Sequence, residues 1–437
     1  MNIKIITFCC FIGLGTCYAQ QTLSPDDAVN YVLDNNYGIK IANKNLEVSE
    51  NNTTIYNTGF LPTVTGNAGA TYNLDNNESE FSDGSTTSLN GAESSRYNAS
   101  LDVNYTLFDG LGRKYNYKRL KEQYQLSALQ ARETIENTII ELFSIYYNVA
   151  QLSENVTTFQ QTLSISQDRL VRSEYQFEYG QNTKLEVLNA EVDINNDSIN
   201  WINTNQQLSN TKRDLNFVMG NQLVDDFNVK TEINFLLEIN KADLLQKAKS
   251  RNVALLQADK SIQISELDIK TGKSSYLPTL GLVGSYGWSK NNNNAASFLA
   301  GSTNTGLSAG LNLSWNIFDG GSTLTTVKNA EIALENQELQ KEQILLSLDR
   351  DFNNAWDDYQ NKLTIFRVQE NNIITAKNNF DRSQEKFKIG QVNSIEFRQA
   401  QLNLLNAELS RNQAKYQAKL SELQVLQLSG QLLNIAY

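Results

Sequence analysis

The chain of 437 residues carries a formal net charge of −11 and contains no histidine. An acidic chain binds nucleic acid poorly, and without imidazole the commonest general base and metal ligand is missing. The acidic residues are scattered along predicted helices rather than paired in a cleft, so we expect no enzyme activity, no metal and no cofactor. All three cysteines, Cys9, Cys10 and Cys17, lie near the start, which leaves none for a disulfide further along.

Residues 1–19 are predicted to be a secretory signal peptide, with Lys4, an apolar run over 5–14 and a cleavage site after Ala19. Lipidation at Cys17 is the alternative, because residues 14–17 loosely resemble a lipobox, although threonine before the cysteine is unfavourable. Beyond this segment no apolar run approaches the roughly 20 residues of a membrane-spanning helix. A secreted chain of this kind is periplasmic, surface-exposed, or inserted in an outer membrane as strands.

The rest of the chain is predicted to be α+β, in two halves with the same order: helix, two strands, very long helix, helix. The first half, 20–222, has a helix over 24–59, strands over 63–74 and 97–108, and helices over 113–179 and 183–219. A linker over 223–235 follows. The second half, 236–437, has a helix over 241–275, strands over 279–288 and 307–318, and helices over 322–389 and 394–429.

The two halves repeat the same motifs, which predicts a duplicated half-molecule. Three motifs recur at a shared offset of 210 residues: Leu107-Phe108-Asp109-Gly110 as Ile317-Phe318-Asp319-Gly320, Tyr179-Gly180-Gln181 as Ile389-Gly390-Gln391, and Gly220 as Gly430. Phe60-Leu61-Pro62-Thr63 also returns, 216 residues later, as Tyr276-Leu277-Pro278-Thr279. The period far exceeds that of solenoid repeats.

The predicted strands alternate apolar and polar residues with period two. In 97–107, apolar residues stand at the odd positions and polar residues at the even ones. About ten residues per strand, with aromatic residues such as Trp288 and Trp315 near the ends, is typical of a transmembrane β-barrel. A half-buried sheet in a soluble protein alternates equally. The small polar residues on one face and the long polar connections over 75–95 and 289–305, which resemble extracellular loops, favour the membrane.

Four strands cannot close a barrel, and an open edge in hydrocarbon leaves backbone groups without hydrogen bonds, at several kcal/mol each. Two copies would give eight strands, a barrel filled by its own side chains, whereas three would give twelve. We therefore expect a homotrimer. Helices over 113–179 and 322–389 would each reach roughly 100 Å at 1.5 Å per residue. Two shorter helices stacked end to end would match each of them, which predicts a helical tunnel that continues the barrel.

A coiled-coil surface protein, such as an adhesin, is the alternative, because it also has long helices poor in glycine and proline. It would be a soluble rod, and it leaves the strands without a role.

Taken together, these features resemble the TolC family of outer-membrane efflux proteins over nearly all of the chain after the leader. The resemblance rests on the Leu-Pro-Thr strand openings, the Phe-Asp-Gly strand exits and the helix-turn motifs over 175–190 and 387–400. It implies a passive, porin-like conduit of a tripartite efflux or type I secretion system in the Gram-negative outer membrane. A trimeric transmembrane barrel would contact outer-membrane lipid, and its periplasmic tunnel would dock to a periplasmic adaptor (membrane fusion) protein and an inner-membrane pump or ABC transporter.

The sequence does not indicate whether the exported substrate is a small-molecule drug, a protein or a metal. Clusters of His, Met or Cys would favour metal export, and the chain has none.

The resemblance also places the turns 179–186 and 389–396 at the periplasmic entrance. The adaptor-docking tips are then Gly180, Gln181, Gly390 and Gln391, although a glycine after a helix is also an ordinary terminator. The predicted gate residues are Leu185, Glu186, Phe387, Val392, Glu396 and Gln399. Thr183 and Glu186 read as a capping box, which Asn393 and Glu396 nearly match. The two glutamates of three copies would also gather six carboxylates near one constriction.

The gate sequence departs from the best-known pattern of the family. The tyrosine, arginine and threonine of that pattern are Phe387, Val392 and Leu185 here, and its second acid is Gln399. We therefore expect an apolar closure by Leu185, Phe387 and Val392 instead of ion pairs.

Six further residues are predicted at the strand–helix junctions: Pro62, Asp109, Gly110, Pro278, Asp319 and Gly320. The prolines end a helix and begin a strand, where a missing N–H is tolerated. The aspartates cap the helices that leave the strands.

Overall fold

The structure is a computed structural model that describes residues 22–223, 227–236, 240–295 and 297–435. The predicted signal peptide and the question of lipidation at Cys17 lie outside these residues. The chain forms two compact units. The strand unit comprises residues 43–131 and 253–345, and the helical unit comprises the described residues of 1–42, 132–252 and 346–437. Among the described helices, none combines the length and apolar character needed to cross a membrane.

Among the described residues, each half of the chain contains two short helices, two long strands, a long helix and a helix of intermediate length. The elements of the first half are α1 (Pro25–Asn35), α2 (Tyr37–Asn52), β2 (Thr63–Glu80), β3 (Thr86–Asp109), α3 (Gly112–Glu178) and α4 (Lys184–Val218). Those of the second half are α5 (Lys241–Arg251), α6 (Val253–Ser274), β5 (Thr279–Asn292), β6 (Gly301–Ser314), α7 (Ser322–Lys388) and α8 (Ser394–Leu428). Short 3-10 helices lie at Ile55–Asn57 and Leu432–Asn434.

The first helix of each half is broken near its middle, where the sequence predicts one continuous helix. Asn36 and Asn252 take extended backbone conformations at the breaks. The Asn36 side-chain amide donates to the carbonyl of Val218 at the end of α4, at 2.9 Å. Asn252 donates to Leu428 at the end of α8, at 3.1 Å. The asparagine at each break therefore binds the end of α4 or α8. Its side chain donates to a carbonyl in the last turn of that helix, where carbonyls have no partner within the helix.

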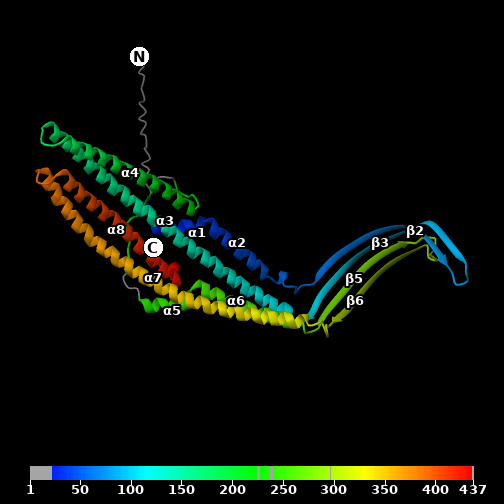
Figure 1. Cartoon of the computed structure of the whole chain (residues 1–437). Coiled ribbons are helices and arrows are strands. Elements are labelled where there is room, and N and C mark those ends of the chain that lie inside the picture. The colour runs from blue at the N-terminus through cyan, green and yellow to red at the C-terminus, as the bar shows by residue number, and fades with distance from the viewer. Residues whose placement is uncertain (1–21, 224–226, 237–239, 296, 436–437) are drawn as a thin grey trace, which may run out of the picture. The chain divides into compact units, whose positions relative to one another are not determined.

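The four long strands form one antiparallel sheet in the order β2-β3-β5-β6 (Figure 1). The predicted loop over 75–95 is wrong, because β2 and β3 continue through it as far as a tight turn at 81–85. The predicted loop over 289–305 is likewise shorter, and β6 ends at Ser314 rather than 318. Hydrogen bonds between neighbouring backbones extend these strands into polar sequence. That sequence lacks the alternation of apolar and polar residues from which a strand could be predicted.

A second, small sheet pairs β1 (Thr22–Leu23) with β4 (Asn228–Val229) in parallel. Only β4 lies inside the segment 223–235 that is predicted to be a linker. The hydroxyl of Tyr146 on α3 donates to the carbonyl of Leu23 at 2.8 Å and accepts from the amide of Lys230 at 3.1 Å. Tyr146 is fully buried, and burial raises the pKa of its phenol. One buried side chain thereby joins two strands that the sequence places more than 200 residues apart.

Candidate functional site

Two helical hairpins, α3–α4 and α7–α8, end in turns at the predicted docking tips. Gly180 and Gly390 have φ angles of 69° and 75°, a left-handed conformation that favours glycine. The amides of Gln181 and Gln391 bond back to carbonyls in the last turn of the long helix, at 2.7 and 2.8 Å. These bonds form the expected helix terminators. All four tip residues are exposed, so the turns are open to a partner.

The helices that follow the two tips begin differently. Asn393 and Glu396 form a complete capping box, with the Asn393 side chain accepting from the Glu396 amide at 2.8 Å. Thr183, which was predicted to cap α4, makes no such bond. The side-chain amide of Asn182 instead donates to the carboxylate of Glu186 at 2.6 Å. Both predicted gate glutamates therefore already bond to residues of their own turn.

The predicted apolar gate residues occupy different environments. Phe387 is 6% exposed and stacks on Phe397, with ring centroids 4.7 Å apart and an interplanar angle of 5°. Phe380 joins this aromatic cluster, and Val392 packs against it. Leu185 is 65% exposed. The structure therefore brings Phe387 and Val392 together inside one hairpin and leaves Leu185 at the surface.

A buried polar network lies behind the tips and joins the two hairpins. The guanidinium of Arg398 on α8 donates to both carboxylate oxygens of Asp197 on α4, each at 2.8 Å. The Asp197 carboxylate also accepts from the hydroxyl of Ser166 on α3, at 2.6 Å. The side chains of Asp197 and Arg398 are 2% and 12% exposed. Two parallel charge-assisted bonds in a buried place hold both hairpins in one geometry.

Further side chains extend this network along α3 and α4. The Gln401 amide donates to the Ser166 hydroxyl at 3.0 Å, and buried Arg169 pairs with Asp193. The Nε atoms of Arg169 and Arg398 are buried without a hydrogen-bond partner among the described residues. Sequence reasoning missed these residues. The available signal was the spacing of Asp193 and Asp197, one helical turn apart on α4.

A cavity of about 230 Å³ opens beside the network at the start of α4 and α8. Glu186 and Gln399 both line it, together with Asn189, Ser394 and Arg398. Glu396 does not line it. The structure thus brings together one predicted gate residue from each hairpin. In the described part of the chain, no three Asp, Glu or Cys side chains gather where they could hold a metal ion.

The strand–helix junctions contain the six residues predicted there. The strands β2 and β5 begin directly after Pro62 and Pro278. The Asp109 carboxylate accepts from the backbone amide of Arg113 at 2.9 Å, and that of Asp319 accepts from the amide of Thr323 at 2.8 Å. The bonds from Thr323 lower the pKa of the Asp319 carboxyl.

The junction glycines Gly110 and Gly320 both have positive φ angles. At Gly110 a Cβ atom would also lie 2.4 Å from the Ser274 carbonyl oxygen, so this position excludes any side chain.

The four-stranded sheet is uncovered on both faces in the single chain. Every residue of β2 and β6 is exposed, and β3 and β5 have no buried residue. One face presents apolar side chains, among them Val64, Tyr72, Leu101, Tyr286 and Leu307. The opposite face presents mainly serine, threonine, asparagine and glycine, together with Asp102 and Arg96 of β3. The edge strands β2 and β6 each pair on one side, within the described residues, which leaves two free edges.

Comparisons with known proteins agree with this architecture. A family model described as outer membrane efflux protein matches residues 28–221 and 244–431, which is most of the chain. Outer membrane protein TolC of Vibrio cholerae is 23% identical over 306 residues, covering 69% of this chain and 70% of the relative. Outer membrane efflux protein BepC of Brucella suis is 18% identical over 398 residues, covering 91% and 83%.

Among solved structures, the CmeC outer membrane channel of Campylobacter jejuni superimposes with a TM-score of 0.75 at 16% identity. The match covers 99% of this chain and 94% of CmeC, and it shows that the two chains share a fold. The match of the family model over both halves settles the assignment. The chain belongs to the outer membrane efflux protein family.

Proposed function

We propose that three copies of this outer-membrane efflux channel associate as a homotrimer, pairing β2 of each copy with β6 of the next. The observation that carries the proposal is the sheet with two free edges and no covered face. Unpaired edges are costly in hydrocarbon, so a sheet with an apolar face must be completed by further strands. Three copies supply twelve strands, which enclose a water-filled lumen, whereas eight strands are filled by side chains.

The two faces of the sheet determine its orientation in this barrel. The apolar face, with Tyr286 and Leu307, turns to lipid, and the polar face lines the lumen. Trp288 and Trp315 are partly exposed near opposite ends of their hairpin, as an interfacial aromatic belt requires. The helices continue the lumen as a periplasmic tunnel.

Interprotomer disulfides test this assembly. Within one chain β2 and β6 are separated by two strands, about 14 Å, which is too far for a disulfide. Ala68→Cys on β2, combined in turn with Thr305→Cys, Leu307→Cys or Ala309→Cys on β6, can therefore cross-link only between copies. We expect one of these pairs to give a ladder that ends at a covalent trimer. Ala68→Cys alone is the matched control and should stay monomeric under denaturing conditions.

A ladder that continues beyond three copies, or no cross-link at any register tried along β6, would contradict the closed trimer. The first result would indicate an open filament, and the second would leave the sheet without an intermolecular partner. The coiled-coil surface protein predicts the second result.

The hairpin tips are proposed as the periplasmic entrance and as the surface that meets an adaptor protein and, through it, an inner-membrane pump or ABC transporter. The exposed turns around Gly180 and Gly390 support this role, and no energy source is needed in the channel itself. Leu185 is proposed to line the closed entrance directly. Phe387 and Val392 would support it from behind, by fixing the shape of the α7–α8 tip.

Single-channel conductance tests the gate. Leu185→Ser should raise the open probability by removing an apolar side chain from the constriction. Phe387→Ala and Val392→Ser should do so by loosening the aromatic cluster. Ile374→Ser changes an exposed residue of α7 away from the tip and serves as a control. An unchanged open probability in all three gate variants would exclude an apolar closure.

A further inference from the structure

Two charged side chains of opposite sign stand on the polar face of the sheet, both on β3. The four-stranded part comprises residues 63–73, 95–109, 279–292 and 301–314. Apart from Asp109 at the helix junction, the charges that this part carries on its polar face are Asp102 and Arg96. The other charged residue, Lys290, pairs in register with Tyr97 and therefore lies on the apolar face.

Asp102 is fixed in place by neighbouring polar groups. Its carboxylate accepts from the Asn67 amide at 2.7 Å and from the Ser100 hydroxyl at 2.8 Å. In register it is followed across the sheet by Ser285 and then Ser308. A broad hollow of about 610 Å³, lined by neutral polar and small residues besides Asp102, opens over this row. The negative charge therefore faces open space rather than a cationic partner.

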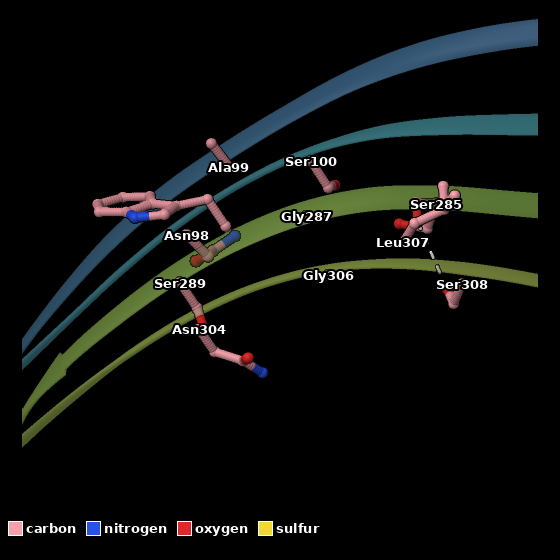
Figure 2. Close-up of a pocket in the computed structure, with 11 residues that line it drawn as sticks. Asn98, Ala99, Ser100, Ser285, Gly287, Ser289, Asn304, Gly306, Leu307 and Ser308 are labelled. Atoms are coloured by element: carbon pink, nitrogen blue, oxygen red, sulfur yellow. Dashed lines mark hydrogen bonds between the residues drawn. The ribbon is translucent and has the colours of Figure 1, made fainter.

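Arg96 lies further along the same strand. Its Nε donates to the side-chain oxygen of Asn291 at 3.0 Å, which leaves the positive charge without a carboxylate partner in this row. The next residue across the sheet in this row is Ser302. Between the two charged rows lies an uncharged row formed by Asn98, Ser289 and Asn304, and Figure 2 shows these three side chains beside a hollow on the sheet.

The two charges act independently at physiological ionic strength. Six residues of one strand separate them, or about 20 Å, while charges are screened over about 8 Å. We propose that Asp102 and Arg96 form two belts of opposite charge in the barrel lumen, and that these belts determine which charged solutes concentrate at each level. The inference rests on the proposed trimer, in which each residue occurs three times at one level. Cations gather at the Asp102 belt and anions at the Arg96 belt.

Thiol reactivity in proteoliposomes measures the potential at each belt without involving the periplasmic gate. Ser308→Cys and Ser302→Cys place a reporter two strands, about 10 Å, from Asp102 and Arg96 respectively. Each is treated with methanethiosulfonate reagents carrying either a trimethylammonium or a sulfonate group. The remaining thiol is then counted by a gel shift, and protein without an introduced cysteine gives the background. Leu307→Cys, on the apolar face, tests whether that face is in lipid.

In 10 mM salt we expect Asp102→Asn to lower the cation-to-anion rate ratio at position 308 by about two- to threefold. Screening then acts over about 30 Å, so the ratio at position 302, which is farther from Asp102, should also fall, but by less than about 1.5-fold. Arg96→Gln should raise the ratio at 302 by about two- to threefold and the ratio at 308 by less than about 1.5-fold. The conservative Asp102→Glu should keep the wild-type ratio at 308, and 1 M salt should remove every difference because screening then acts over about 3 Å.

The outcomes separate the inference from the proposed function. Equal reaction at positions 307 and 308 would refute the lipid-embedded barrel. Reaction at 308 but not at 307, with a ratio that Asp102→Asn leaves unchanged, would refute the charged belts and leave the barrel standing. Protection of 307 together with the two selective shifts supports both.

Discussion

The pair between Arg398 and Asp197 gives the sharpest quantitative prediction, because it joins the two hairpins through buried charges. Replacing Arg398 by methionine leaves the Asp197 carboxylate buried with only the Ser166 hydroxyl as a donor in this network. Removing one partner of a buried ion pair costs about 3–5 kcal/mol. Since the Ser166 bond remains, we expect about 3 kcal/mol, which corresponds to a factor of about 150 in a local opening equilibrium.

Hydrogen exchange of backbone amides near residues 190–200 and 395–405 measures this opening directly. Arg398→Met should lower their protection about 100-fold. Arg398→Met combined with Asp197→Leu removes the uncompensated charge, so protection should recover to within about tenfold of wild type. Lys388→Met breaks an exposed pair with Glu385 and should change protection less than about twofold.

A change of less than fivefold in Arg398→Met would show that the pair does not hold the hairpins together. A second result would also refute the reasoning. It is a loss of protection in the Arg398→Met, Asp197→Leu double variant as large as the losses of the two single variants added together. It would mean that the two side chains contribute independently, through packing rather than through their charges.

Three further predictions concern stability in detergent. Phe397→Ala should cost about 3–5 kcal/mol by opening a cavity in the aromatic cluster, whereas exposed Ile395→Ala should cost under about 0.5; equal midpoints in thermal unfolding would contradict this. Gly110→Ala should unfold at lower temperature than Gly84→Ala, because both have positive φ but only Gly110 lacks room for a Cβ; the reverse order would refute it. Burial raises the pKa of the Glu136 carboxyl, so the folded state binds the carboxyl proton more tightly than the unfolded state does. The free energy of unfolding should therefore fall as pH rises above the ordinary pKa of a glutamate. Glu136→Gln should make the free energy of unfolding less dependent on pH in this range, and an unchanged pH dependence would exclude the effect.

The strands could be predicted from sequence where their apolar and polar faces alternate, and the long helices where glycine and proline are absent. The extensions of β2 and β3 could not, because 75–95 is mostly polar, with Phe81 and Leu89 as its only large apolar residues, and only pairing with the neighbouring strand makes it extended. The breaks in the first helix of each half could not be predicted either. Asn36 and Asn252 look like ordinary helical residues until the ends of α4 and α8 meet them.

The candidate site was predictable only in part. The turn glycines and the junction aspartates carry local signals, since a left-handed turn and a helix start each demand particular residues. Asp197 carries only a weak signal, its spacing of one helical turn from Asp193, because an aspartate on a polar helix usually faces solvent. Its burial depends on Arg398, which lies 201 residues away in the chain. Phe387 was expected to face a pore, but Phe397, ten positions later, buries it.

The central claim is that this chain forms a channel across the outer membrane, and single-channel recording tests it most directly. Detergent-purified protein added to a planar lipid bilayer should insert and show discrete openings, small in wild type and larger when Phe387 and Val392 are truncated. Folded protein that stays dispersed without detergent and never inserts would contradict the account.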